Sequence, residues 1–591
     1  MPASTGHPHI DALLLALDRE KAAIEEEIAQ LRAQPLPARA ALGFTWYPLD
    51  LLTVEYRSKG RMNVVLRGQD LHAGIGAGDP VVLAPLGRPD QGWSGRCEGA
   101  DGSTVELRVD GSPDGKGPWA VSRRLDHSLM DKQADALRRA VNLKGPLAAL
   151  LLGRESPYRP DPWESACFSG LDPSQRAAAE LALGATEVGL LHGPPGTGKT
   201  RVLVAILQAL KERGERAWAL ADSNMAVDHL ALTASRAGLD VVRLGVSARI
   251  GLEVSTLALE HRILHGARAA VIQKLLRQAT RASGLEQQEL RAAINEEWSA
   301  AKREILENAD VVAMTLGTLH TRGEGLTAPR TAVVDEATQI WEPALWLLAS
   351  RVKRLILAGD PQQLGPVVKS RDPVLERSLL QRLVDEGFPF PMLDTQYRMN
   401  DALLRLCGPN YPGRLHSHPS VAGQRLVDLG IQPGPWTDPP ARFVDTAGVG
   451  LEEEPDGMGS YANPGELRVL EQVLTSLRAG GLQNDQVGII TPYSAQLRAI
   501  HQRFPGIESG SVNAFQGREK EVILASFVRS NGDQEVGFVA DPRRLNVSVS
   551  RARRLFVGVG DSETLGTQPM FRKLLEAVGE GYLSAWELET G

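Results

Sequence analysis

The stretch GPPGTGKT, residues Gly193 to Thr200, decides the fold. It follows the apolar run EVGLLH and precedes a segment whose apolar side chains recur at helical spacing. A glycine-rich loop of this form between a strand and a helix is a P-loop, whose backbone N–H groups surround phosphates at a helix N-terminus. Lys199 is expected to reach the β and γ phosphates, and the Thr200 hydroxyl to ligate Mg²⁺. We therefore predict that ATP binds to Gly193, Pro194, Pro195, Gly196, Thr197, Gly198, Lys199 and Thr200.

Around this loop, short apolar runs alternate with helical patterns. EVGLLHG, RAWALADS, DVVAMTL, TAVVDEA and RLILAGD precede a second series, QVGIITPY, EVILASFV and RLFVGVGD. This rhythm is typical of parallel α/β sheets, one in each half of the chain. We predict an α/β fold with two RecA-like parallel-sheet lobes in tandem, over 166–375 and 376–591. Charge-rich helical residues at about 255–305 predict a helical insertion in the first lobe.

The residues before the first lobe have a different sequence pattern. Apolar residues at heptad spacing between about 10 and 33 predict an amphipathic helix, which we assign with its flanks to a stalk over 1–38. Short β-rich runs separated by Gly, Pro and Asp predict a small β-barrel over 39–125. A second helical stretch over 126–165 then forms a linker to the first lobe.

Composition narrows the class of protein. The chain has 591 residues, 42% hydrophobic and 23% charged, and lacks an apolar run of the length that a membrane span requires. Without a secretory signal, we expect a cytoplasmic protein that does not contact membranes. Its three cysteines are far apart, so neither a zinc module nor an iron–sulfur cluster is expected from cysteine alone. The net charge of −7 still allows a local basic groove.

Acidic and basic residues complete a candidate catalytic set. Asp335 and Glu336 end a predicted strand, so their side chains diverge, and we expect Asp335 to hold Mg²⁺ and Glu336 to polarise the attacking water. Hydrolysis also needs positive charge at the transition state. Arg398 and Arg551 lie in the half of the chain without a P-loop, and we expect them to supply that charge from the second lobe.

Taken in order, the motifs resemble those of superfamily-one helicases of the Upf-like group, in the branch that includes Smubp and Sen. The resemblance covers the chain from about residue 130 onward. It rests on these blocks: LDPSQRAA around Gln175, GPPGTGKT, DSNMAVDHL (222–230), VVRLG (241–245), ADVVAMTLG (309–317), VVDEATQ, GDPQQLGP (359–366), QYRM (396–399), TPYSAQ (491–496), NAFQGREKEV (513–522) and RLNVSVSRAR (544–553).

The resemblance implies further roles. Gln175 is similar to the glutamine that reads adenine, Tyr397 to the aromatic residue that stacks on it, and Glu519 to the acid that binds the ribose. Gln363 resembles the γ-phosphate sensor, and Arg398 and Arg551 resemble paired arginine fingers. The floor of the strand groove is implied to be Ser223, Asn224, Thr315, Pro492 and Tyr493, although polar residues at strand ends often only cap the next helix.

Three residues depart from the family pattern. Asn513 stands where Asp is usual, Asp222 replaces a common Pro, and Ser550 replaces a common Thr but keeps the hydroxyl. Asn513 lies in the segment that links the ATP motifs to the motifs for strand contact. Because it lacks the usual charge, we expect it to affect how tightly ATP hydrolysis is coupled to strand binding. The family layout also implies the barrel, the stalk and the helical insertion, and the chain reads as a bare helicase core.

The resemblance implies a monomeric ATP-dependent helicase or translocase that moves 5′ to 3′ on single-stranded DNA or RNA and meets duplex junctions, with ATP and Mg²⁺ as cofactors. Two alternatives stay open. The chain could be a translocase that remodels nucleoprotein complexes without unwinding duplexes. It could also be a nucleotide-gated clamp that binds nucleic acid without productive turnover.

Overall fold

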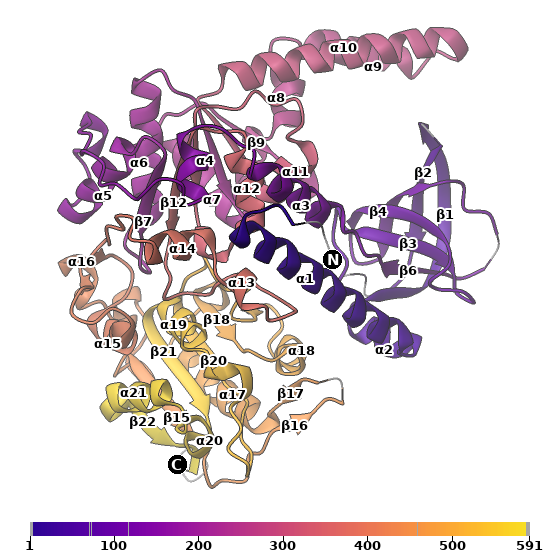
Figure 1. Cartoon of the computed structure of the whole chain (residues 1–591). Coiled ribbons are helices and arrows are strands. Elements are labelled where there is room, and N and C mark those ends of the chain that lie inside the picture. Colours follow the sequence, from indigo (N-terminus) through magenta and orange to yellow (C-terminus); the bar gives the residue numbers. More distant parts are fainter. Residues whose placement is uncertain are drawn as a thin grey trace.

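Two parallel sheets, one in each half of the chain, form the centre of the fold (Figure 1). The structure is a computed structural model, which describes residues 4–586 apart from 59, 70, 72, 73, 116 and 458. The first three residues of the predicted stalk and the last five of the predicted second lobe lie outside the described residues. In the described part, no helix combines the length and the apolar character needed to cross a membrane.

The first sheet has the strand order β7-β12-β11-β8-β10-β9, and all of its neighbouring strands are parallel. Every residue of these strands is buried, as expected for a parallel sheet that helices cover on both faces. The strands are β7 (Val188–His192), β8 (Ala217–Ala221), β9 (Val241–Leu244), β10 (Val311–Thr315), β11 (Thr331–Val334) and β12 (Arg354–Gly359).

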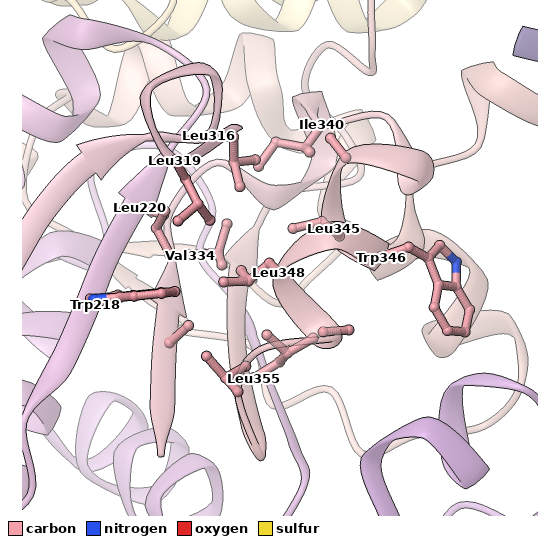
Figure 2. Packing of buried hydrophobic residues seen from close by; sticks show 14 of the residues in the cluster. Trp218, Leu220, Leu316, Leu319, Val334, Ile340, Leu345, Trp346, Leu348 and Leu355 are labelled. Atoms are coloured by element: carbon pink, nitrogen blue, oxygen red, sulfur yellow. The ribbon is translucent and has the colours of Figure 1, made fainter. Parts of the chain in front are cut away.

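Alternate strand residues supply two separate cores. Trp218 and Leu220 face α12 (Glu342–Ala349), and Figure 2 shows them with Leu345 and Leu348 of that helix. Their neighbours Ala217, Ala219 and Ala221 pack on the opposite face. The helices on that face are α5 (Pro173–Gly184), α6 (Lys199–Glu212) and α7 (Asn224–Arg236).

The second sheet has the order β19-β18-β20-β21-β15-β22 and is also parallel. Helices α15, α19 and α21 cover one face, and α17 and α18 cover the other. Two such sheets in one chain fit RecA-like lobes in tandem. The bounds are β15 (Ala441–Asp445), α15 (Asp401–Cys407), α17 (Pro464–Ala479), β18 (Val487–Ile490), α18 (Ser494–Arg503), β19 (Glu508–Gly510), β20 (Lys520–Ser526), α19 (Pro542–Ser550), β21 (Ala552–Gly560), α21 (Pro569–Val578) and β22 (Tyr582–Ser584).

The residues before the first sheet form a long helix and a closed antiparallel barrel. Helix α1 (Pro8–Ala33) buries Ile10, Leu13, Leu14 and Leu17 in the first-lobe core that contains α12. Its far end leads through α2 (Leu36–Ala41) into the barrel, whose described strands have the order β1-β2-β5-β4-β3-β6. The strands are β1 (Thr45–Ser58), β2 (Arg61–Arg67), β3 (Pro80–Pro85), β4 (Trp93–Ala100), β5 (Thr104–Asp110) and β6 (Trp119–Arg123), followed by α3 (Ser128–Ala140) and α4 (Pro146–Leu151).

A helical arm projects from the first lobe between β9 and β10 (Figure 1). It consists of α8 (Leu259–His265), α9 (Ala269–Ala279) and α10 (Gly284–Asn308). Helices α9 and α10 lie side by side, and few of their side chains are buried. The arm runs from residue 259 to residue 308, and the limits predicted for the insertion were about 255 and 305.

The chain remains with the first lobe after β12. Helix α14 (Leu379–Asp385) packs in the same core as α12, and Leu393 packs in the core on the opposite face of the sheet. The backbone N–H of His192 donates to the carbonyl of Pro391 at 2.9 Å. The boundary placed between residues 375 and 376 therefore falls inside the first lobe. Helical periodicity alone does not specify which of two sheets a helix covers.

Candidate active site

The P-loop connects β7 to α6, and its backbone shape requires glycine. Gly196 and Gly198 have φ angles of 74° and 76°, a region that other residues adopt at a cost. A Cβ atom at Gly196 would lie 2.7 Å from the Cβ atom of Arg398 in the second lobe. Residues 193–200 line one side of a cavity of about 730 Å³, with Lys199 as the first residue of α6. This is the geometry of an anion site at a helix N-terminus.

Lys199 lies between the two predicted acids. Its Nζ atom is 3.1 Å from Oδ1 of Asp335 and 2.5 Å from Oε1 of Glu336. Burial alone would lower the pKa of Lys199, but the two carboxylates outweigh it and hold that pKa above its ordinary value. The site therefore keeps a cation on the cavity wall at neutral pH, where phosphate oxygens would compete with the acids for it.

Glu336 adopts a backbone conformation that is rare for its residue type. Its φ angle is 52°, in the left-handed region. Gln339 donates to Oε2 of Glu336 at 2.9 Å, and the backbone N–H of Glu336 donates to Oδ1 of Asp335 at 2.8 Å. Burial would raise the pKa of Glu336, but Lys199, with help from Gln339, outweighs burial and lowers that pKa below its ordinary value, so the carboxylate stays ionised. Strained residues of this kind concentrate at active sites, which supports the role predicted for Glu336.

The second lobe brings Arg551 to the same cavity. Arg551 is 2% exposed, and its NH2 atom donates to Oε1 of Gln363 at 3.2 Å and to the Ser550 hydroxyl at 2.9 Å. Burial, with help from nearby Arg398, lowers the pKa of Arg551 to about 10, so the guanidinium remains charged at neutral pH. The predicted γ-phosphate sensor and one predicted arginine finger are thus in direct contact.

Arg398 and Glu519 form an ion pair at the edge of the cavity. The Nε atom of Arg398 is 2.5 Å from Oε2 of Glu519, which also pairs with Arg553. Burial opposes ionisation of Glu519, but the two arginines lower its pKa to about 2. All three residues line the cavity. The acid predicted to bind ribose therefore also anchors the arginine predicted to contact phosphate.

Gln175 and Tyr397, predicted to hold the adenine, both contact the P-loop, but only Tyr397 lines the cavity. Gln175 is buried, and its Nε2 atom donates to the carbonyl of Thr197 at 2.9 Å. Tyr397 lines the cavity, donates its hydroxyl to Asp172 at 2.9 Å and stacks on His418 with 4.7 Å between ring centroids. Gln175 thus supports the loop from behind, while Tyr397 presents an aromatic ring beside it.

Of the predicted groove residues of the first lobe, Ser223 and Thr315 cap helices, whereas Asn224 accepts from Arg243 at 2.8 Å, and the three divide between two cavities. The Ser223 hydroxyl accepts from the N–H of Ala226 at 3.1 Å and lines the P-loop cavity. The Thr315 hydroxyl accepts from the N–H of Thr318 at 3.1 Å. Thr315 and Asn224 line a second cavity of about 680 Å³ between the first lobe, α1 and the barrel. Ser223 and Thr315 therefore act as helix caps, and contact with a nucleic-acid strand would be an additional role.

In the second lobe, Tyr493 is covered rather than open. It is 3% exposed, and its ring meets Tyr461 edge-on at 5.7 Å and Phe538 at 4.5 Å. Arg529 donates to the Tyr493 hydroxyl at 3.3 Å. Phe538 is 41% exposed and was not predicted, because a single aromatic residue in the run GFVAD carries no spacing signal. Pro492 next to Tyr493 is half-buried.

A buried network that the sequence analysis did not identify lies beneath Gln363. Asp360 accepts from Gln363 at 2.9 Å and from the Tyr411 hydroxyl at 2.5 Å, and it contacts His192 at 3.0 Å. Asn546 of α19 donates to the Tyr411 oxygen at 2.9 Å. The network joins the end of β12 to the second lobe. Asp360 and Gln363 are three residues apart, but His192, Tyr411 and Asn546 come from distant parts of the sequence, so no local pattern could have revealed the whole network.

Comparison with known proteins also divides the chain into two parts, with the division at residues 371–375. Two family models, each described as an AAA domain, match residues 170–371 in overlapping segments and residues 375–563. The rat "DNA-binding protein SMUBP-2" is 35% identical over 437 residues, covering 69% of this chain and 44% of that protein. The "DNA polymerase alpha-associated DNA helicase A" of Schizosaccharomyces pombe is 33% identical, with 67% and 64% covered. The "ATP-dependent helicase NAM7" of Saccharomyces cerevisiae is 33% identical, with 85% and 55% covered.

The chain belongs to the Upf-like group of superfamily-one helicases. It spans about half the length of the curated relatives it matches. Asn513 is one of the residues that depart from the pattern of the Upf-like group, and it lies in the wall of the P-loop cavity. Its Oδ1 atom accepts from NH1 of Arg544 at 3.3 Å, and the Arg544 guanidinium lies 5.2 Å from the Phe538 ring. Arg544, which lies between the P-loop cavity and the Phe538 ring, is therefore paired with a neutral amide, that of Asn513.

Proposed function

We propose that this chain is an ATP-dependent nucleic-acid helicase or translocase that hydrolyses ATP between its two lobes. One observation carries the proposal: Lys199, Asp335 and Glu336 of the first lobe line the same cavity as Arg398 and Arg551 of the second. A pocket built from both lobes closes fully only when both contact the nucleotide. Binding and hydrolysis of ATP then change how the lobes are held together.

Each side chain has a distinct task in this reaction. Lys199 exchanges its carboxylate partners for the β and γ phosphates, and Glu336 orients the attacking water. Thr200 and Asp335, two oxygen donors on the cavity wall, fit Mg²⁺, which would neutralise phosphate charge. Arg398 and Arg551 stabilise the charge that develops on the transferred phosphoryl group, and Gln363 relays its presence to Arg551. Tyr397, Gln175 and Glu519 hold the base and ribose.

The proposed nucleic-acid path runs across both lobes. It follows Ser223, Asn224, Thr315, Pro492 and Tyr493, where a single strand of DNA or RNA would be held through its backbone without sequence readout. Motion from 5′ to 3′, action at duplex junctions, a monomeric state and a cytoplasmic location are parts of the proposal. We further propose that α1, α2 and α3 form a stalk for the barrel, with domain limits close to 38, 125 and 165.

The decisive experiment compares ATP hydrolysis with and without single strands, using matched DNA and RNA. Strand-stimulated hydrolysis, lost in Lys199→Ala, supports the proposal. Duplexes with 5′ or 3′ overhangs then give the polarity, and a protein-displacement assay separates unwinding from remodelling. A chain that binds ATP and strands but shows no stimulated turnover would instead be a nucleotide-gated clamp.

A further inference from the structure

Helix α1, which packs on the first lobe, contacts the chain a few residues after Gln363. Glu20 lies on α1 and is 1% exposed. Its Oε1 atom accepts from the backbone N–H of Lys369 at 2.9 Å, and its Oε2 atom accepts from the backbone N–H of Ser370 at 2.8 Å. A buried carboxylate whose two oxygens each receive a backbone N–H from one segment fixes the position of that segment closely.

Neighbouring side chains of α1 hold the same segment. Arg19 donates to Asp372 at 2.9 Å, and Lys369 donates its ammonium group to Glu27 at 2.7 Å. From the first lobe, the indole N–H of Trp341 donates to the carbonyl of Val367 at 3.0 Å. The far end of the segment, residues 367–372, is therefore attached to α1 and to the first lobe.

The near end of the segment is attached to the second lobe. Leu364 is buried in the second-lobe core, and Asn546 of α19 donates to the carbonyl of Gln362 at 2.8 Å. Gln363 lies between these two residues and contacts Arg551. Residues 362–372 thus cross from one lobe to the other beside the P-loop cavity, and the contacts of Glu20 define where the segment ends.

We propose that Glu20 is a positioning residue for Gln363, so that α1 determines how the γ-phosphate sensor meets the nucleotide. The inference rests on the proposed ATP hydrolysis. The segment follows β12 of the first lobe and is held by the second lobe at Gln362 and Leu364, so movement of the second lobe relative to the first would pull on it. Because Glu20 fixes the far end of the segment, the segment changes its shape when the lobes move, and Gln363 stays aligned with Arg551 and the phosphate.

The test uses the full-length Glu20→Gln variant, which keeps the shape of the side chain. Because each of the two N–H groups faces a different oxygen of Glu20, the amide oxygen keeps one hydrogen bond and the NH₂ group opposes the other N–H. We expect strand-stimulated kcat to fall about tenfold while KM for ATP stays within about twofold, because the change misplaces a group that acts in the transition state. Hydrogen exchange in residues 367–372 should become faster.

Lys21→Ala is the matched control on the same helix. Lys21 pairs with Asp131 of α3 at 2.6 Å, so this variant weakens the attachment of α1 without a contact to the segment. We expect both kcat and exchange at 367–372 to stay at the wild-type level in this variant. If Glu20 only fastened α1 to the protein, the two variants would behave alike.

The result that would overturn the inference is a kcat for Glu20→Gln within twofold of wild type, or a loss that Lys21→Ala shares. Unchanged exchange at 367–372 would also overturn it. A wild-type chain without strand-stimulated hydrolysis would refute the proposed function instead. Hydrogen exchange would still decide whether Glu20 holds the segment, so the two failures can be told apart.

Discussion

Replacing Arg551 with Met tests the contribution of the second lobe. Burial and the nearby Arg398 lower the pKa of Arg551 from its ordinary value to about 10, which means that the folded state disfavours the cation by about 3 kcal/mol. Replacement by Met removes this cost but also removes the hydrogen bonds to Gln363, Ser550 and backbone carbonyls, worth about 1 kcal/mol each. Met keeps an apolar stem of similar length. We therefore expect the free energy of unfolding to change by less than about 2 kcal/mol.

The rate should respond far more strongly than the stability. A transition-state arginine in phosphoryl transfer contributes about 10³-fold or more to kcat, or about 4 kcal/mol. Strand-stimulated hydrolysis, measured at saturating ATP, should fall by that factor, whereas the Kd of a non-hydrolysable ATP analogue should change by less than about threefold. Arg572→Met, an exposed position on α21, serves as the control. Equal losses in kcat and in affinity would refute the reasoning, since they would show a ground-state contact.

Three further changes address other parts of the site and fold. Lys199→Ala should reduce turnover to background because it removes the cation that meets the β and γ phosphates; residual hydrolysis above about a tenth of wild type would contradict this. Glu336→Gln should bind ATP normally, in a filter or fluorescence assay, but stop hydrolysis, so near-normal turnover would exclude Glu336 as the group that activates water. Glu466 on α17 is buried, and burial raises its pKa to about 8 although Ser526 and the N–H of Val528 donate to it. Since the folded state keeps a proton that the unfolded state releases above about pH 4.5, wild-type stability should fall between about pH 5 and pH 8 by up to about 1.4 kcal/mol per pH unit. The Tm of Glu466→Gln relative to wild type should therefore rise over that range, and a constant difference would contradict the assignment.

The parts of the site that the sequence predicts are those that local spacing encodes. GPPGTGKT and the pair Asp335–Glu336 have a recognisable form because a phosphate loop and a strand end each use consecutive residues. The resemblance placed Arg398, Arg551 and Gln363 in one pocket, and the structure brings all three to the same cavity. These contacts span up to 188 residues of sequence, so no periodicity could have indicated them.

Other features depend on tertiary packing that sequence patterns do not contain. Helix α14 carries the same apolar spacing whichever sheet it covers, so its place in the first lobe was not predictable. Glu20 reads as one more charged residue on an amphipathic helix, although it is almost fully buried. Tyr493 was expected at the floor of a groove, and the structure instead surrounds its ring with Tyr461, Phe538 and Arg529. Burial of this kind arises from partners far away along the chain.

The way α1 joins the first lobe has a consequence for how the chain folds as it is made. The apolar face of α1 shares a core with α12 and α14, and His9 near its start contacts Glu342, which also binds Arg382. Those partners leave the ribosome more than 300 residues later, which takes roughly 20 to 70 s at typical rates of synthesis. Helices α3 and α4 of this core are made earlier, but Ile10, Leu13, Leu14 and Leu17 are fully covered only after the later partners have been made. Helix α1 therefore completes its packing late in synthesis, and its apolar residues offer a binding site for chaperones until then.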